Sequence, residues 1–125
     1  MNIVDSTLWL EYFAGTETGN IISETIENTS ELIVPTITIY EVFKKLLFER
    51  SEDEALFAIA HMRQGTVVEL SDELSLSAAK ISKDYKIPMA DSIIYATNMK
   101  YNCILWTQDK HFVDLKSVNY FNKEK

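Results

Sequence analysis

Short apolar runs alternate with longer segments of helical spacing along the whole chain, and this alternation limits the possible folds more than any other feature. The runs that read as strands are 2–4, 32–35, 67–68, 103–107 and 117–121. Between them, apolar residues recur every three or four positions, which is the period of a helix packed on one face. Strands separated by helices favour a parallel sheet with helices on both faces. The sequence therefore predicts the α/β class, with a central sheet of four to five strands.

The helical segments have recognisable starts and ends. Helices are expected over about 6–14, 18–28, 38–49, 52–64, 72–81 and 89–100, with one further helical turn in 108–115. Ser51 and Ser71 each precede acidic residues and are expected helix caps. Thr38 and Glu41 have the spacing of a capping box, in which the carboxylate returns to the backbone of the cap residue. Pro88 suits the beginning of the helix that follows it.

Length and composition are those of one domain with a real core, because the chain has 125 residues and 46% of them are apolar. The domain is expected to span 1–121, followed by a frayed polar tail over 122–125. No apolar stretch approaches the roughly 20 residues that a membrane span requires. Cys103 is the only cysteine, so no intrachain disulfide is possible. We therefore expect a soluble protein of the reducing cytoplasm, with no membrane partner.

The charge of the chain is distributed unevenly. The formal net charge is -7, and residues 1–43 hold seven acids and no Lys or Arg. The rest of the chain is balanced, with twelve acids and twelve basic residues. A polyanion should avoid the acidic third and meet basic groups elsewhere. The candidate substrate contacts near the predicted site are Lys44, Lys45, Lys110 and His111.

Four carboxylates stand where apolar runs end or helices begin: Asp5, Glu41, Asp91 and Asp109. Each has a structural alternative, as a helix cap, a capping box, a first-turn anion or a turn residue. The carboxyl ends of parallel strands share one edge of a sheet, however, and open α/β folds bind ligands there. Two charges about 4 Å apart repel by roughly 4 kcal/mol at an effective dielectric near 20, whereas a cap contributes about 1 kcal/mol. A cation is therefore expected among them.

The four carboxylates offer oxygen ligands, and the sequence has no cluster of His or Cys. This combination favours Mg²⁺ or Mn²⁺ over zinc. Such ions are suited to phosphodiester hydrolysis, because they activate water and neutralise charge on the phosphate oxygens. The sequence does not choose between one ion and two. Thr107 ends one strand-like run and Ser6 lies just beyond another, and both are candidates to position the carboxylates, although such hydroxyls are more often local caps.

Taken together, three segments and one further acid resemble the PIN-domain ribonucleases. The segments are MNIVDSTLW (1–9), ADSIIYA (90–96) and LWTQDKHF (105–112), and the further acid is Glu41. The likeness covers the whole chain and is greatest to the small toxins of VapBC toxin–antitoxin pairs. The resemblance implies a PIN-like α/β/α sandwich. It also implies that Asp5, Glu41, Asp91 and Asp109 bind Mg²⁺ or Mn²⁺ for RNA cleavage, with Asp109 in the most variable segment.

The resemblance also implies partners. Toxins of this type are held inactive by a small DNA-binding antitoxin that inserts an arm at or near the acidic site, so DNA would be met only through that antitoxin. A homodimer is common in the family, and its contacts would come from exposed aromatics among Trp9, Tyr12, Phe13, Phe43, Phe48 and Phe57. The competing interpretation is that most of these rings belong to the core.

Three other functions compete with that of a toxin. PIN domains also act in RNA processing without an antitoxin. A phosphoryl-transfer enzyme with an aspartyl-phosphate at Asp5 would be expected to carry a second Asp where this chain has Thr7. A non-catalytic α/β binding module would use the four acids only as caps. Calorimetry with Mn²⁺ separates a metal site from a set of caps.

Overall fold

The computed structural model describes residues 1–122, and its centre is a sheet of five parallel strands. The strands are β1 (Asn2–Val4), β2 (Leu32–Pro35), β3 (Thr66–Val68), β4 (Ile104–Thr107) and β5 (Val118–Tyr120), in the order β3-β2-β1-β4-β5. In the central strand, Ile3 pairs with Ile33 on one side and with Leu105 on the other. The parallel sheet predicted from the alternating pattern is thus confirmed.

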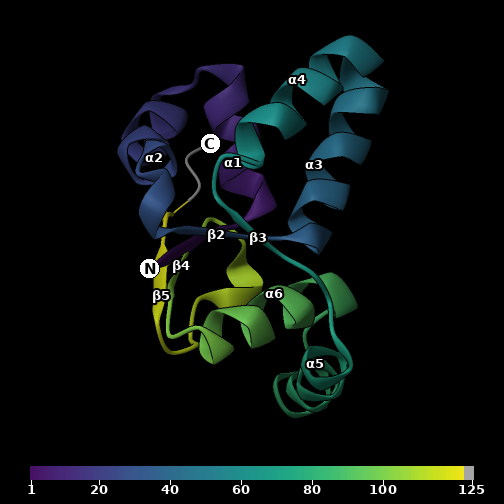
Figure 1. Cartoon of the computed structure of the whole chain (residues 1–125). Coiled ribbons are helices and arrows are strands. Elements are labelled where there is room, and N and C mark those ends of the chain that lie inside the picture. Colours follow the sequence, from purple (N-terminus) through teal and green to yellow (C-terminus); the bar gives the residue numbers. More distant parts are fainter. Residues whose placement is uncertain (123–125) are drawn as a thin grey trace.

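Helices cover both faces of this sheet (Figure 1). One layer contains α1 (Ser6–Ala14), α2 (Glu17–Glu27), α3 (Thr36–Glu49) and α4 (Glu52–Met62). The opposite layer contains α5 (Asp72–Tyr85) and α6 (Met89–Lys100), which pack against each other. Two short 3₁₀ turns complete the described chain, η1 (Thr29–Glu31) and η2 (Lys110–Phe112). The three-layer α/β/α arrangement predicted from the sequence is confirmed.

Each face of the sheet has its own core. Trp9 and Val34 lie in the cluster under α1 to α4, where both side chains are buried. Ile94, Leu105 and Phe112 lie in the cluster on the α6 side and are fully buried. The strands β1, β2 and β4 therefore contribute apolar residues to the cores on both faces, as expected for the centre of a parallel sheet.

Two glycines fix how α1 meets α2. Gly15 ends α1 with φ 70°, a left-handed conformation that glycine adopts without strain. Gly19 lies in α2 against the backbone of α1, and a Cβ added there would be 2.3 Å from the Glu11 carbonyl oxygen. Both glycines allow the close packing of α1 against α2, and Asp5 is the residue between β1 and α1.

The predicted capping box of Thr38 and Glu41 is wrong. The helix begins at Thr36, two residues earlier than expected, with Pro35 at its N-cap position. Proline lacks an N–H and has a fixed φ, so it can end β2 and precede the first helical residue without leaving a donor unpaired. Thr38 is therefore inside the helix and buried, and its hydroxyl has no hydrogen-bond partner. Glu41 lies in the second turn and does not cap the helix.

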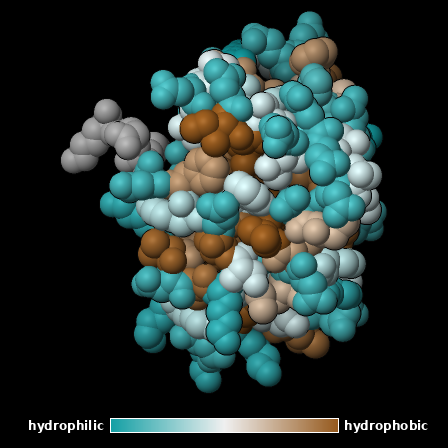
Figure 2. All heavy atoms as spheres, turned by 90° about the vertical axis from the view of Figure 1, so that its left-hand side faces the viewer, coloured by the Kyte–Doolittle hydropathy of each residue, from teal (hydrophilic) through white to brown (hydrophobic). Residues whose placement is uncertain are grey.

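The side of the molecule that carries α2 and β5 shows several separate apolar patches among hydrophilic atoms (Figure 2). Apolar atoms make up much of the surface of any folded protein, so these patches alone do not mark a site. No helix within residues 1–122 is long and apolar enough to span a bilayer. Apart from Asn122, the tail that was expected to be frayed lies outside the described residues.

Candidate functional site

Four sequence-predicted carboxylates come from different elements around the carboxyl edge of the sheet. Asp5 follows β1 and Asp109 follows β4 by two residues. Glu41 lies in the second turn of α3, the helix that follows β2, and Asp91 lies in the first turn of α6. Electrostatic repulsion links Asp109 to Asp5, Glu41 and Asp91, so the fold brings all four into one neighbourhood.

Asp5 is the most deeply buried of these acids, with 1% of its surface exposed. It occupies the N-cap position of α1, but its side chain makes no capping hydrogen bond. Its Oδ2 instead accepts hydrogen bonds from the hydroxyls of Thr7 at 2.8 Å and Thr107 at 2.9 Å. Burial raises the pKa of Asp5, the two hydroxyls oppose this, and repulsion from Asp109 adds to it. The interpretation of Asp5 as a simple cap is therefore wrong.

Glu41 has a buried oxygen without a partner, because its Oε1 makes no hydrogen bond. Burial raises the pKa of this carboxyl group, a hydrogen bond from the Ser6 side chain lowers it, and repulsion from Asp5 and Asp109 raises it further. An unpaired buried acceptor costs about 1–3 kcal/mol. A cation or a donor group that contacts this oxygen would remove that cost.

Asp91 is buried at the start of α6, with 8% of its surface exposed. Burial is the main reason that the pKa of Asp91 rises from 3.8 to about 7, and repulsion from Asp109 is the next. A hydrogen bond with His111 opposes the rise, since His111 Nδ1 lies 2.7 Å from Asp91 Oδ2. Perturbed acids of this kind are typical of functional sites.

Asp109 and His111 close one side of the cluster. The Asp109 Oδ1 accepts a hydrogen bond from the backbone N–H of His111 at 2.9 Å and lies 3.1 Å from His111 Nδ1. The backbone N–H of Asp109 donates to the Thr107 hydroxyl at 2.9 Å. A hydrogen bond with Asp91 is the main cause of a raised pKa at His111. The sequence marked His111 as a substrate contact, and the structure places it against two of the acids.

The residues present fit a divalent cation. Asp91, Asp109 and His111 each offer one ligand atom, and these atoms lie within 4.8 Å of one another. The unpaired Oε1 of Glu41 supplies a further acceptor. Carboxylate oxygens suit Mg²⁺ and Mn²⁺, and the mutual repulsion that raises the acids' pKa values would be relieved by positive charge.

The other sequence-predicted residues are placed as follows. Lys44 and Lys45 line a cavity together with Glu41, whereas Lys110 is exposed at the start of η2. Thr107 hydrogen-bonds to Asp5, and Ser6 hydrogen-bonds to Glu41. Thr7 was missed as an Asp5 partner. The only sign of it in the sequence is a second hydroxyl residue directly after Ser6.

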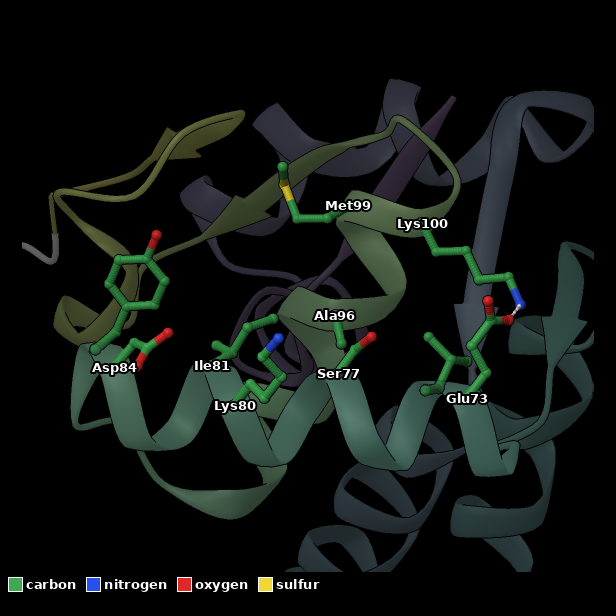
Figure 3. Close-up of a pocket in the computed structure, with 10 residues that line it drawn as sticks. Glu73, Ser77, Lys80, Ile81, Asp84, Ala96, Met99 and Lys100 are labelled. Carbon is green, nitrogen blue, oxygen red and sulfur yellow. Dashed lines mark hydrogen bonds and ion pairs between the residues drawn. The ribbon is translucent and has the colours of Figure 1, made fainter.

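A separate cavity of about 510 Å³ lies between α5 and α6, away from the four acids. Figure 3 shows the lining residues, among them Lys80 and Asp84 on α5 and Ala96 and Met99 on α6, with an ion pair between Glu73 and Lys100 at one end. That pair is 2.6 Å long and solvent-exposed, so its net contribution to stability is small. Among the described residues, only Asp91, Asp109 and His111 form a group of possible metal ligands. The acidic edge is therefore the candidate site.

Comparison with solved structures gives neighbours of the same fold. A toxin–antitoxin complex from Klebsiella pneumoniae has a TM-score of 0.79 and 19% identity, and the match covers 95% of this chain and 96% of that one. DNA-bound VapBC from Salmonella typhimurium has a TM-score of 0.75 and 13% identity, with 96% of both chains covered. VapC20 from Mycobacterium tuberculosis, a Sarcin-Ricin loop cleaving toxin, has a TM-score of 0.70 and 14% identity, with 82% and 85% covered.

Comparison with curated proteins gives no match. The model of one family, the PIN domain, matches residues 3–118. This range contains β2, β3 and β4 in full and parts of β1 and β5, and it contains all four carboxylates. The chain belongs to the PIN-domain family.

Proposed function

We propose that this protein is a divalent-metal-dependent endoribonuclease and the toxin of a VapBC-type toxin–antitoxin pair. The observation that carries the proposal is the convergence of Asp5, Glu41, Asp91 and Asp109, with a buried Glu41 oxygen that has no hydrogen-bond partner. If Glu41 served only as a helix cap, its oxygens would be paired with backbone N–H groups, because burying an acceptor without a partner costs free energy. Membership of the PIN family supports nuclease chemistry at this edge.

In this proposal the four carboxylates hold one or two Mg²⁺ or Mn²⁺ ions. When bound, such ions polarise the phosphate and activate water for attack on the phosphodiester bond. Thr7 and Thr107 orient Asp5 through its Oδ2, and Ser6 orients Glu41. The burial of Asp5 and Asp91 excludes bulk water from their side chains, which strengthens electrostatic interactions with a cation.

The proposed partners are RNA as substrate, a small antitoxin, and a second copy of the chain in a homodimer. The neighbours from Klebsiella pneumoniae and Salmonella typhimurium are toxin–antitoxin complexes, and the latter is bound to DNA. Contact with DNA would come through the antitoxin. The proposed compartment is the cytoplasm, where the buried thiol of Cys103 stays reduced.

The test of nuclease function is cleavage of labelled single-stranded RNA by the purified protein. We expect cleavage with Mn²⁺ or Mg²⁺, no cleavage with EDTA, and loss of at least about 100-fold in Asp91→Asn. The matched control is Asp84→Asn, since Asp84 is an exposed acid of α5 outside the cluster. Undiminished cleavage in EDTA or in Asp91→Asn would contradict the proposal.

The toxin role has a test of its own. Expression of the chain alone should arrest growth, and co-expression of the adjacent short open reading frame should restore it through a stable complex. An active nuclease that neither arrests growth nor binds the neighbouring gene product would be an RNA-processing PIN enzyme instead.

A further inference from the structure

One face of α3 begins at the acidic site, at Glu41, and continues along the helix to Phe48. Tyr40, Glu41, Lys44, Lys45 and Phe48 line a cavity of about 260 Å³; we call this five-residue surface the α3 platform. Residues three and four positions apart are neighbours on a helix, so the five side chains form a continuous strip. At 1.5 Å per residue, Phe48 lies about 10 Å along the helix axis from Glu41. The platform is therefore continuous with the site through Glu41.

The two rings of the platform are largely in water. Tyr40 is 59% exposed and Phe48 is 81% exposed, whereas Trp9 of the neighbouring helix is fully buried. Lys44 Nζ lies 5.8 Å from the centre of the Tyr40 ring. Two ammonium groups therefore lie between two rings along the strip, and surfaces that bind unpaired nucleic acid strands likewise combine basic groups with aromatic rings.

Charge distinguishes this face from the acidic first third of the chain. Lys44 and Lys45 are the first basic side chains of the sequence, after 43 residues without any Lys or Arg. They lie beside Glu41, one of the carboxylates that would repel a phosphate chain. Lys45 forms an exposed ion pair with Glu49 at 3.0 Å, and such pairs contribute little to stability. Both ammonium groups can therefore turn to phosphates at small cost.

We propose that the α3 platform binds single-stranded RNA beside the scissile phosphate, with bases stacked on Tyr40 and Phe48 and phosphates on Lys44 and Lys45. This inference rests on the proposed ribonuclease function and adds the surface along which the substrate strand lies. Bases inside a duplex are stacked on each other and cannot lie on a protein ring. Stacking on aromatic side chains tolerates any base, so the platform sets the strand's path and not its sequence.

A protein partner fits this face less well. The buried centres of protein interfaces are depleted in lysine, yet Lys44 lies between the two rings. An apolar partner helix would have to desolvate that ammonium group together with the rings. Phosphates supply the complementary charge directly.

The test is fluorescence anisotropy of a labelled oligouridine, which forms little internal structure, in EDTA. The parent protein is Asp91→Asn, so that no cleavage occurs during the titration. Tyr40→Ala and Phe48→Ala should each weaken binding about 5- to 150-fold, which corresponds to the stacking of one base. Lys44→Gln should reduce the slope of log affinity against log salt by about 0.7.

The matched control is Tyr101→Ala. Lys100 Nζ lies 5.7 Å from the centre of the Tyr101 ring, so this pair has the same composition, but it lies at the C-terminal end of α6, whereas Asp91 is in the first turn. Its loss should leave RNA affinity unchanged. Unchanged thermal unfolding of each variant will show that the exposed rings were not needed for folding.

The outcomes separate this inference from the proposed function. RNA cleavage by the wild-type protein together with normal RNA binding by Tyr40→Ala and Phe48→Ala would overturn the platform and leave the nuclease standing. Loss of binding in both variants, with no cleavage by the wild-type protein, would support the platform and contradict the nuclease. Conversion of a dimer to a monomer in sedimentation, with RNA binding intact, would identify the face as a protein interface and overturn the inference.

Discussion

The hydroxyl of Thr107 donates a 2.9 Å hydrogen bond to Asp5 Oδ2 across 102 positions of sequence. The same hydroxyl accepts from the backbone N–H of Asp109. One threonine at the end of β4 therefore ties the carboxylate that follows β1 to the turn that carries Asp109. Because β1 and β4 are neighbours in the sheet, this contact depends on the strand order.

Replacement of Thr107 by valine tests this connection. Valine keeps the shape but lacks the hydroxyl, so Asp5 loses one of its two hydroxyl donors and the turn at Asp109 loses an acceptor. We expect Mn²⁺ affinity and RNA cleavage to fall about 10- to 100-fold, as for other residues that orient metal ligands. Thr107→Ser keeps the hydroxyl and should retain most of both. A loss in Thr107→Ser with none in Thr107→Val would show that the methyl packing matters and not the hydrogen bond.

His111 is expected to change which metal the site prefers. Its Nδ1 lies 2.7 Å from Asp91 Oδ2 and 3.1 Å from Asp109 Oδ1, spacings close to the ~3 Å between adjacent ligands of an ion bound at about 2.0–2.1 Å. Imidazole nitrogen favours transition metals over Mg²⁺. His111→Ala should therefore weaken Mn²⁺ binding about tenfold with little effect on Mg²⁺. Lys110→Ala is the control, and an unaltered ratio of the two affinities would exclude His111 as a ligand.

Metal binding should depend on pH around neutrality. Burial raises the pKa of Asp91 to about 7, and a carboxyl group must lose its proton before it can bind a cation. Below about pH 7 the apparent Mn²⁺ affinity should thus fall by up to about tenfold for each pH unit. The measurement is a calorimetric titration between about pH 5.5 and 8. A constant affinity over this range would mean that Asp91 is not a ligand.

The metal-free protein should become more stable when Asp91 is replaced by asparagine. The folded pKa of Asp91 is raised above the ordinary 3.8, so the folded state retains a proton that the unfolded chain releases, and stability falls as pH rises from about 4 to 7. An asparagine side chain at this position would not titrate. At pH 8 in EDTA we expect Asp91→Asn to gain about 1 kcal/mol, roughly 3–5 °C in melting temperature, despite the loss of the Asp91 contact with His111.

At about pH 4.5 the gain should disappear, because the wild-type carboxyl group is then protonated in the folded state. Repulsion from Asp109 and Asp5 on neighbouring elements contributes to the shift, and His111 opposes it. If Asp91→Asn is less stable than wild type at pH 8, the free energy lost with the His111 contact is larger than the free energy gained by removing the buried charge.

Much of the fold was predictable because the strands and helices have different apolar periods. Asp5 and Asp109 were found from their positions after strand-like runs, and those runs are strands in the structure. Glu41 was identified, but its local role was predicted wrongly, since the helix start depends on Pro35 and not on Thr38. The sequence alone does not give the strand order β3-β2-β1-β4-β5, on which every contact between distant acids depends.

Side-chain contacts inside the site were less predictable. The partnership of Thr7 with Asp5 depends on how α1 leaves β1, and the approach of His111 to Asp91 depends on the direction of the turn η2. Among the aromatics, Trp9 belongs to the core as expected, whereas Phe48 and Phe57 are exposed. Periodicity assigns a residue to a helix face, but it does not show whether another element covers that face.

The most direct test of the account is a calorimetric titration of the metal-free protein with Mn²⁺ at pH 8. If carboxylates from four separate elements form one cation site, the wild-type protein should bind Mn²⁺, and Asp5→Asn and Asp91→Asn should each lose that binding while remaining folded. The exposed control Asp84→Asn should bind normally. Wild-type protein that binds no Mn²⁺, or binding that survives both substitutions, would contradict the account.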